Sequence, residues 1–318
     1  MKTNILKKLF VKIIKSFGFE LLDQNQFNSP TLNKNLNEQL TNIDKSIVLP
    51  LGEVKITRKI SSLLIIFRTN TNIEIWDQNK KRIFENKKIE YVKRSLNSLI
   101  KAVKNLKENY NSIKIDIKIV DDNSTKENLT VIKGILDKSK ENYEIINHKN
   151  SVHLNIIKEQ KSKDTFSNLS SLLKCFELGK NNGEDLIYFI EDDYLHFRSS
   201  LEEMVGTYER IASQLNKDLI ICPSDYPYLY MSNEKTNLLI GSKRHWRTIN
   251  KSLCSFMTSK NILNKYWDNF YQNCLDRHDP FEKYLNLIYE KEICISPVKS
   301  LSIHMTNINS SYGLSPFI

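Results

Sequence analysis

Glycine is scarce in this sequence, with 8 residues in 318, and neither G-x-G-x-x-G nor G-x-x-x-x-G-K-[ST] occurs. Loops of these two kinds let the backbone approach a bound phosphate closely. Their absence argues against dinucleotide-binding folds and against P-loop nucleotide hydrolases. A methyltransferase is disfavoured as well, because the first predicted strand is followed by Arg68-Thr69-Asn70-Thr71 and not by a glycine-rich turn.

Cysteine is also sparse, and no two cysteines form a C-x-x-C pair. The five positions are Cys175, Cys222, Cys254, Cys274 and Cys294. An odd number without such a pair predicts neither a disulfide framework nor a zinc site. No apolar run approaches the ~20 residues that span a bilayer, and residues 1–17 lack the compact apolar core and cleavage site of a signal peptide. We therefore expect a cytoplasmic protein.

What the chain does contain is an ordinary apolar fraction, 40%, and an excess of positive charge, +10. The apolar fraction is enough to form a buried core. A basic balance favours polyanionic partners such as nucleotide diphosphates or an anionic membrane, although lysine-rich composition alone would also produce it. No basic stripe with interleaved aromatic residues lies near the acidic clusters, so no nucleic-acid partner is expected.

The first 59 residues are predicted to form an extension of the main domain. Residues 4–18 place apolar side chains at helical spacing, with lysines largely on the other side. Such a helix can lie on an anionic membrane or pack on the domain behind it. Residues 23–44 are polar and rich in Asn and Gln, which is typical of a linker. We predict an extension at 1–59 and a single domain at 60–318.

Strands and helices alternate through the domain. Strands are predicted at 61–67, 113–120, 143–147, 186–190 and 218–222. Helices are predicted at 89–110, 129–138, 166–179, 200–215 and 279–289, with a long loop before the last. This order predicts an α/β fold with a mainly parallel sheet flanked by helices. In such sheets ligands bind at the carboxyl ends of the strands.

Three carboxylates, Glu191-Asp192-Asp193, follow the apolar strand at 186–190. Adjacent carboxylates repel one another unless a cation or solvent compensates them. Mg²⁺ and Mn²⁺ take oxygen ligands and commonly bridge to substrate phosphates. Glu191 and Asp193 alternate and so point the same way from an extended chain. A metal site and a solvated turn remain alternative interpretations of this run.

A second acidic cluster, Asp121-Asp122, follows the strand at 113–120. One carboxylate at this position can accept hydrogen bonds from a nucleobase or a ribose. Asn123 and Ser124 suit a turn and the cap of the next helix.

Taken together, these residues resemble the GT-A glycosyltransferases, and most closely the family-two branch. The resemblance rests on Phe67-Arg68-Thr69-Asn70, Val120-Asp121-Asp122-Asn123-Ser124 and the run Gly183 to Asp193. It spans roughly residues 60–305, and its second half resembles an uncharacterised bacterial and phage-like subgroup. It implies a GT-A fold with a nucleotide-binding half at about 60–195 and an acceptor half at about 196–318.

The resemblance also implies roles for single residues. Thr69 and Asp122, or Asp121, would touch the nucleoside, and Asp192 would lie on the donor side. Glu191 and Asp193 would hold Mn²⁺ or Mg²⁺ on the diphosphate. The sequence departs from the family pattern at two places. The first is the usual Asp-x-Asp, which is Glu-Asp-Asp here. In addition, Lys174-Cys175 stands where an Arg-Asn pair is usual, which leaves Lys174 to meet phosphate as a point charge.

Residues later in the chain each have a structural and a functional interpretation. Asp279 and Glu282 fit a helix start with a capping box, and the resembling enzymes place their catalytic base in this part of the chain. His304, near a predicted strand end, is either a structural residue or an additional metal ligand. His245-Trp246-Arg247 suits a sugar or a diphosphate, although Trp246 also suits the core, and Arg247 is assigned to the donor.

We expect transfer of a sugar from a nucleotide-diphosphate donor to a hydroxyl of a glycan, lipid or protein, with inversion implied by the resemblance. Two alternatives stay open. A metal-dependent phosphohydrolase or nuclease also uses clustered carboxylates. A degenerate domain of this type would act as a glycan- or membrane-binding module without catalysis.

Overall fold

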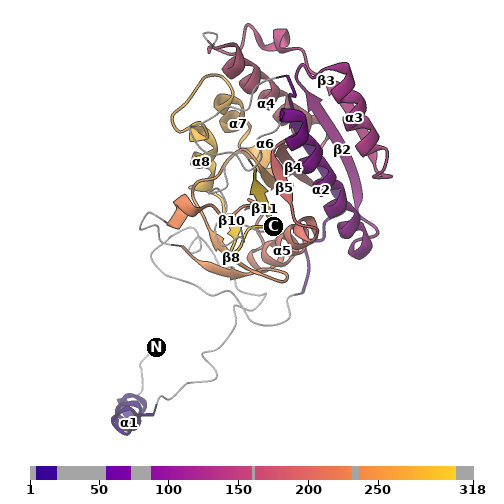
Figure 1. Cartoon of the computed structure of the whole chain (residues 1–318). Coiled ribbons are helices and arrows are strands. Elements are labelled where there is room, and N and C mark those ends of the chain that lie inside the picture. Colours follow the sequence, from indigo (N-terminus) through magenta and orange to yellow (C-terminus); the bar gives the residue numbers. More distant parts are fainter. Residues whose placement is uncertain (1–4, 20–54, 73–86, 160–161, 231–235, 306–318) are drawn as a thin grey trace.

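A computed structural model describes residues 5–19, 55–72, 87–159, 162–230 and 236–305 (Figure 1). In these segments no helix is both long and apolar enough to cross a membrane. The predicted polar linker at 23–44 lies outside the described residues, and the boundary between residues 59 and 60 stays a prediction.

The main element is a nine-stranded sheet. Its strands are β1 (Ser62–Thr69), β2 (Lys114–Asp121), β3 (Asn142–Asn147), β4 (Leu186–Glu191), β6 (Ile220–Ile221), β7 (Leu238–Ile240), β8 (His245–Thr248), β9 (Phe256–Ser259) and β10 (Cys294–Pro297). They are ordered β3-β2-β1-β4-β9-β6-β10-β8-β7. Only β8 and β9 run against the others. A second small sheet pairs β5 (Tyr194–His196) with β11 (Ser302–His304).

Helices cover the sheet. They are α1 (Ile5–Ser16), α2 (Lys88–Asn109), α3 (Lys126–Leu136), α4 (Lys163–Asn182), α5 (Ser200–Leu215), α6 (Lys260–Lys265), α7 (Trp267–Asn273) and α8 (Lys283–Tyr289), with 3₁₀ turns η2 (Asn150–His153) and η3 (Pro227–Tyr230). α2 packs beside α3 and α5, whereas α4 packs with α6 and α7. The right-handed rule for crossovers puts α2 and α3 on one face and α4 on the other. The predicted α/β fold class is confirmed.

The sequence pattern explains the central strands. β1 and β4 are almost wholly buried, as continuous apolar runs between two helix layers should be. In β2 exposed or half-buried residues alternate with buried ones along most of its length. The parallel register brings Thr69 beside Asp121 and Arg68 beside Glu191. The ends of β1, β2 and β4 therefore meet at one edge of the sheet.

The predicted long loop before the last helix is wrong. Between Cys222 and Asp279 the chain forms η3, β7, β8, β9, α6 and α7. These strands have three or four residues and the helices six or seven, which is too short for a hydrophobic period to repeat. β9 enters the sheet between β4 and β6 and is antiparallel to both.

Candidate functional site

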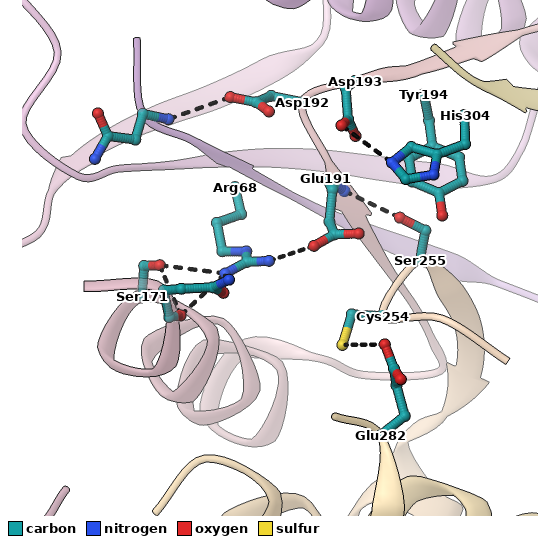
Figure 2. Close-up of polar contacts among 12 residues, drawn as sticks. Arg68, Ser171, Glu191, Asp192, Asp193, Tyr194, Cys254, Ser255, Glu282 and His304 are labelled. Atoms are coloured by element: carbon teal, nitrogen blue, oxygen red, sulfur yellow. Dashed lines mark hydrogen bonds and ion pairs between the residues drawn. The ribbon is translucent and has the colours of Figure 1, made fainter. Parts of the chain in front are cut away.

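Glu191 ends β4 and is held by Arg68 from the neighbouring strand. The Arg68 Nη2 lies 2.5 Å from Glu191 Oε1, and its Nη1 donates to the Asn168 carbonyl at 3.0 Å (Figure 2). Burial alone would lower the pKa of Arg68, but the surrounding acidic groups, Glu191 first among them, together raise it. The Glu191 backbone N–H donates to Ser255 Oγ at 3.1 Å. Arg68 thus compensates the first of the three adjacent carboxylates.

Asp192 turns in another direction, toward the start of α2. Its Oδ1 lies 2.5 Å from Lys88 Nζ, and its Oδ2 accepts from Thr69 Oγ1 at 2.8 Å and from the Asn70 N–H at 3.2 Å. Burial opposes the charge on Lys88, yet Asp192 and Asp193 raise the pKa of Lys88 above its usual value. Asp192 therefore joins the ends of β1 and β4 to the first residue of α2.

Asp193 faces His304. The Oδ2 of Asp193 lies 3.1 Å from His304 Nε2, and the imidazole stacks on Tyr194 with ring centroids 4.8 Å apart (Figure 2). Burial opposes ionisation of Asp193, but His304 and Lys88 together outweigh it, and the pKa of Asp193 lies well below its usual range. Antiparallel pairing of β5 with β11 brings this histidine to the carboxylates, because His304 is the partner of Tyr194.

Asp121 and Asp122 line the other side of the edge. Asp122 Oδ1 accepts from Asn150 Nδ2 at 2.8 Å, and its Oδ2 accepts from the Ser167 hydroxyl. Asp121 Oδ2 accepts from the Ser124 N–H at 3.1 Å, whereas its Oδ1 is buried without a hydrogen-bond partner. Burial raises the pKa of both carboxyls. Asp121 Oδ1 is thus a buried acceptor at the place expected for a nucleoside.

The turn after β2 matches the predicted Asp-Asp-Asn-Ser chemistry with one correction. Asn123 has a φ of 71°, in the left-handed region that asparagine tolerates better than most residues. The cap of α3 is Thr125, whose hydroxyl accepts from the Asn128 N–H at 3.3 Å. Ser124 Oγ accepts instead from the Thr71 N–H at 3.0 Å and ties this turn to the end of β1.

Glu282 reaches the site from a distant part of the chain. Its Oε1 lies 3.9 Å from the Cys254 Sγ, below Glu191 in Figure 2. Burial raises the pKa of Glu282 to about 7, with Glu191 adding to the shift and His304 opposing it. A carboxyl with this pKa exchanges its proton near neutral pH.

The predicted capping box around Asp279 is wrong. Helix α8 begins at Lys283, and Glu282 is its N-cap residue without a side-chain cap hydrogen bond. The reason is that the Glu282 carboxyl points to Cys254 and not back to the helix start. Asp279 lies exposed on the surface. Of the two candidate bases, only Glu282 is placed beside the strand-end carboxylates.

Two predicted donor contacts lie elsewhere. Lys174 forms a pair with Glu177, one turn along α4, with Nζ and Oε2 4.0 Å apart. It lies two turns beyond Ser167, roughly 10 Å along the helix axis. Arg247 donates from Nη2 to Asp225 Oδ1 at 2.9 Å. Neither contact involves a strand-end carboxylate.

The tryptophan next to Arg247 belongs to the core. Trp246 is fully buried, and its Nε1 donates to Glu203 Oε1 at 3.1 Å. It therefore offers no stacking surface to a sugar, and the core interpretation of Trp246 is the right one.

Sequence reasoning assigned no role to Arg68, Lys88 or Asn150. Arg68 is the one charged residue of an otherwise apolar strand, which is a readable signal for a partner at the strand end. Lys88 and Asn150 give no such signal, because they reach the site from the start of a helix and from a 3₁₀ turn.

The donor atoms around Asp193 suit a divalent cation. Asp193 Oδ1 is buried without a hydrogen-bond partner, and His304 supplies a nitrogen beside Oδ2. Mg²⁺ and Mn²⁺ often use one or two protein ligands and complete their shell with waters and substrate phosphates. Among the described residues, no three His, Cys, Asp or Glu side chains are grouped as a preformed metal site. The predicted ligand Glu191 is engaged by Arg68.

No protein-family model matches the chain, and no curated protein matches it in sequence. Solved structures do match. S. aureus TarS 1-349 gives a TM-score of 0.44 at 10% identity, over 76% of this chain and 59% of that one. The galactosyltransferase LgtC with donor and acceptor sugar analogues gives 0.38 at 13% identity, over 73% and 72%. The bifunctional glycosyltransferase WbbM gives 0.40 at 9% identity, over 77% and 40%.

Glycosyltransferases are thus among the structures to which this chain is similar, as the sequence resemblance predicts. The chain spans less than two thirds of TarS 1-349 and of WbbM.

Proposed function

We propose that this protein is a glycosyltransferase that moves a sugar from a nucleotide-diphosphate donor to a hydroxyl acceptor. The observation that supports this most directly is the meeting of two acidic clusters at one edge of the sheet. Thr69 pairs with Asp121 and Arg68 with Glu191, so both clusters border the same space. Ligands of open α/β sheets bind outside the carboxyl ends of the strands.

Within this proposal the two clusters have different tasks. Asp121, with its unpartnered buried Oδ1, would accept a hydrogen bond from the nucleoside, and Asp122 would support that side. Arg68 and Lys88 form ion pairs with Glu191 and Asp192 and would orient the diphosphate. Lys174 and Arg247 have no such place in the proposal.

Glu282 is our candidate for the catalytic base. Its pKa of about 7 leaves much of it ionised at neutral pH, when it can accept the proton of an acceptor hydroxyl. The deprotonated oxygen would then attack the anomeric carbon on the side opposite the leaving diphosphate, which inverts the configuration there. Burial of Glu282 and its neighbour Glu191 account for this tuning.

Asp193 and His304 would hold a Mn²⁺ or Mg²⁺ ion, with Glu191 as a further ligand. A bound ion of this kind supplies positive charge against the negative charge that develops on the leaving diphosphate. The chain contributes the unpartnered Oδ1 of Asp193 and the imidazole nitrogen of His304.

The acceptor class stays open among glycan, lipid and protein hydroxyls. A cytoplasmic location, predicted from cysteine usage, belongs to the same proposal. All five cysteines are free and buried.

The decisive test is a thermal-shift panel of UDP, GDP and CMP and their sugar conjugates, with and without Mn²⁺. A ligand at about a hundred times its dissociation constant stabilises the native state by about 2.7 kcal/mol. We expect one nucleotide to raise the melting temperature only with metal, and Asp193→Asn to remove that shift. Asp268→Asn, which changes an exposed aspartate on α7, is the matched control and should keep it.

Other results would favour the alternatives. A shift by nucleotide that ignores both metal and Asp193→Asn would favour the degenerate binding module. Binding of single-stranded DNA that weakens steeply with salt, with no response to any nucleotide sugar, would favour the nuclease. If no nucleotide or nucleotide sugar changes the melting temperature, with or without Mn²⁺, the proposed donor site is rejected.

A further inference from the structure

The N-terminal helix α1 exposes an apolar side to solvent. Leu9, Phe10, Ile13 and Phe17 are 57%, 55%, 48% and 73% exposed. At a hundred degrees per residue these four side chains fall within one arc of about 100°. The rest of the described chain does not cover them, although large apolar residues normally contribute to a core. An isolated helix of this length is only marginally stable in water, so α1 needs a partner surface.

The charges of the segment identify that partner. The first 19 residues contain five lysines and no aspartate or glutamate. Within α1, the same helical spacing puts Lys12 at the border of the apolar arc and Lys15 on the opposite side. Lys12 and Lys15 are exposed. The partner must therefore offer an apolar layer and negative charge together.

An anionic lipid surface offers both. Acyl chains receive the apolar arc, while lysines at its border reach the headgroup phosphates. A nucleic acid would neutralise the lysines and leave the aromatic side chains in water. A second copy of α1 would bring like charges together. We infer that α1 binds in the plane of an anionic bilayer surface and holds the domain against it.

The energetics give this inference a measurable form. Each lysine near an anionic surface strengthens binding about fivefold, and this contribution falls with ionic strength. Reversing the charge of two lysines should thus weaken binding at least about tenfold. Loss of two buried aromatic side chains should have a comparable effect.

The test uses the full chain and sedimentation with vesicles of phosphatidylcholine alone or of equimolar phosphatidylcholine and phosphatidylglycerol. We expect binding to the anionic vesicles only, weakened by salt. Lys12→Glu with Lys15→Glu, and separately Phe10→Ser with Phe17→Ser, should each lower it at least about tenfold without changing the melting temperature. Lys101→Glu with Lys104→Glu makes the same charge change on the exposed side of α2 and should retain binding.

Three results would overturn the inference. One is equal sedimentation with neutral and anionic vesicles, or none with either. Another is equal loss from the α2 control, which would place the contact on the domain. The third is a lipid-free oligomer that Phe10→Ser with Phe17→Ser dissociates, since a second copy would then cover the apolar side. None of these readouts involves sugar transfer, so they are independent of the proposed function.

Discussion

The Arg68–Glu191 and Arg247–Asp225 pairs both set a guanidinium against a carboxylate, but their surroundings differ. Asp225 is 1% exposed, and its Oδ2 also accepts from Tyr230 OH at 2.6 Å. The Arg247 guanidinium lies 4.0 Å from the centre of the Tyr230 ring. The Glu191 side chain is 26% exposed, at the edge where the central strands end. The comparison teaches that an Arg–carboxylate pair can take part in ligand binding when its carboxylate is accessible to solvent, and is structural when its carboxylate is buried.

The largest expected effect is on turnover, at Glu282, which lies on the same side as Glu191. Glu282→Gln should lower the turnover of the donor selected in the thermal-shift panel by about 10² to 10⁴-fold, because the base is lost. The wild-type rate should rise with pH through about 7, the pKa of Glu282, and the variant should lack this rise. Release of nucleotide diphosphate measured across pH checks both. Asp279→Asn is the control, and a loss equal to that of Glu282→Gln would shift the base to Asp279.

Whereas the rate should rise with pH, the contribution of Glu282 to the free energy of unfolding should fall with pH. Its pKa is raised from 4.5 to about 7, so its stabilising contribution is present below 4.5 and lost as pH rises through 7. Glu282→Gln removes the buried charge and should stabilise the protein at pH 8 by on the order of 2 kcal/mol. Denaturant unfolding at pH 5 and pH 8 measures this. A variant that is less stable than wild type at pH 8 would contradict the burial argument.

The next largest effect is expected at the buried Arg247–Asp225 pair. Arg247→Met leaves the Asp225 carboxylate buried without its cation and should cost about 3–5 kcal/mol of the free energy of unfolding. Nucleotide binding by the folded fraction should not change, because Arg247 pairs with Asp225 and not with Glu191, Asp192 or Asp193. Urea unfolding and the nucleotide shift measure the two quantities. Retained stability with lost nucleotide binding would place Arg247 in the site after all.

At the Arg68–Glu191 pair, which is open to solvent, we expect a smaller loss of stability and a larger loss of nucleotide affinity. Arg68→Met removes one cation from the edge of the site but leaves Glu191 in contact with water, so the cost in stability should be smaller, about 1–3 kcal/mol. Nucleotide affinity should fall by about 1.4 kcal/mol or more, which is tenfold. Titration of nucleotide with saturating Mn²⁺ measures this, with Arg58→Met as an arginine control on the other side of the domain. Equal affinities for Arg68→Met and wild type would remove Arg68 from the proposal.

The smallest effect is expected at Lys174. Lys174→Met should leave nucleotide affinity within about twofold, because a half-exposed pair with Glu177 contributes little. The same nucleotide titration checks it. A tenfold loss would restore the phosphate role that the resemblance implies and would require α4 to shift when the donor binds.

The central part of the fold could be predicted from the sequence because its elements are long. β1, α2, β2, α4 and β4 repeat their apolar pattern enough times to define both type and position. The segment between Cys222 and Asp279 could not be predicted, since its strands β7, β8 and β9 have only three or four residues. Their pairing depends on contacts far apart in the chain, which no local pattern contains.

The site shows the same division. Thr69, Asp121 and Asp192 follow long strands, so the parallel register alone brings them together. Lys88 and Glu282 come from the starts of helices whose tertiary placement sets their contacts. Lys174 lies in the middle of α4 and pairs with Glu177, and no local pattern shows which side chains of a helix reach the ends of the strands.

The reversed direction of β9 has a consequence for how this protein tolerates insertions and deletions. Because β9 runs against β4, Phe256 pairs with Phe189, and the residues before β9 lie at the site edge of the sheet. Ser255 and Cys254 reach Glu191 and Glu282 from there. A length change in the segment before β9 therefore moves groups that touch the carboxylates. Homologues should vary in length after Ser259, on the far edge, more readily than before Phe256.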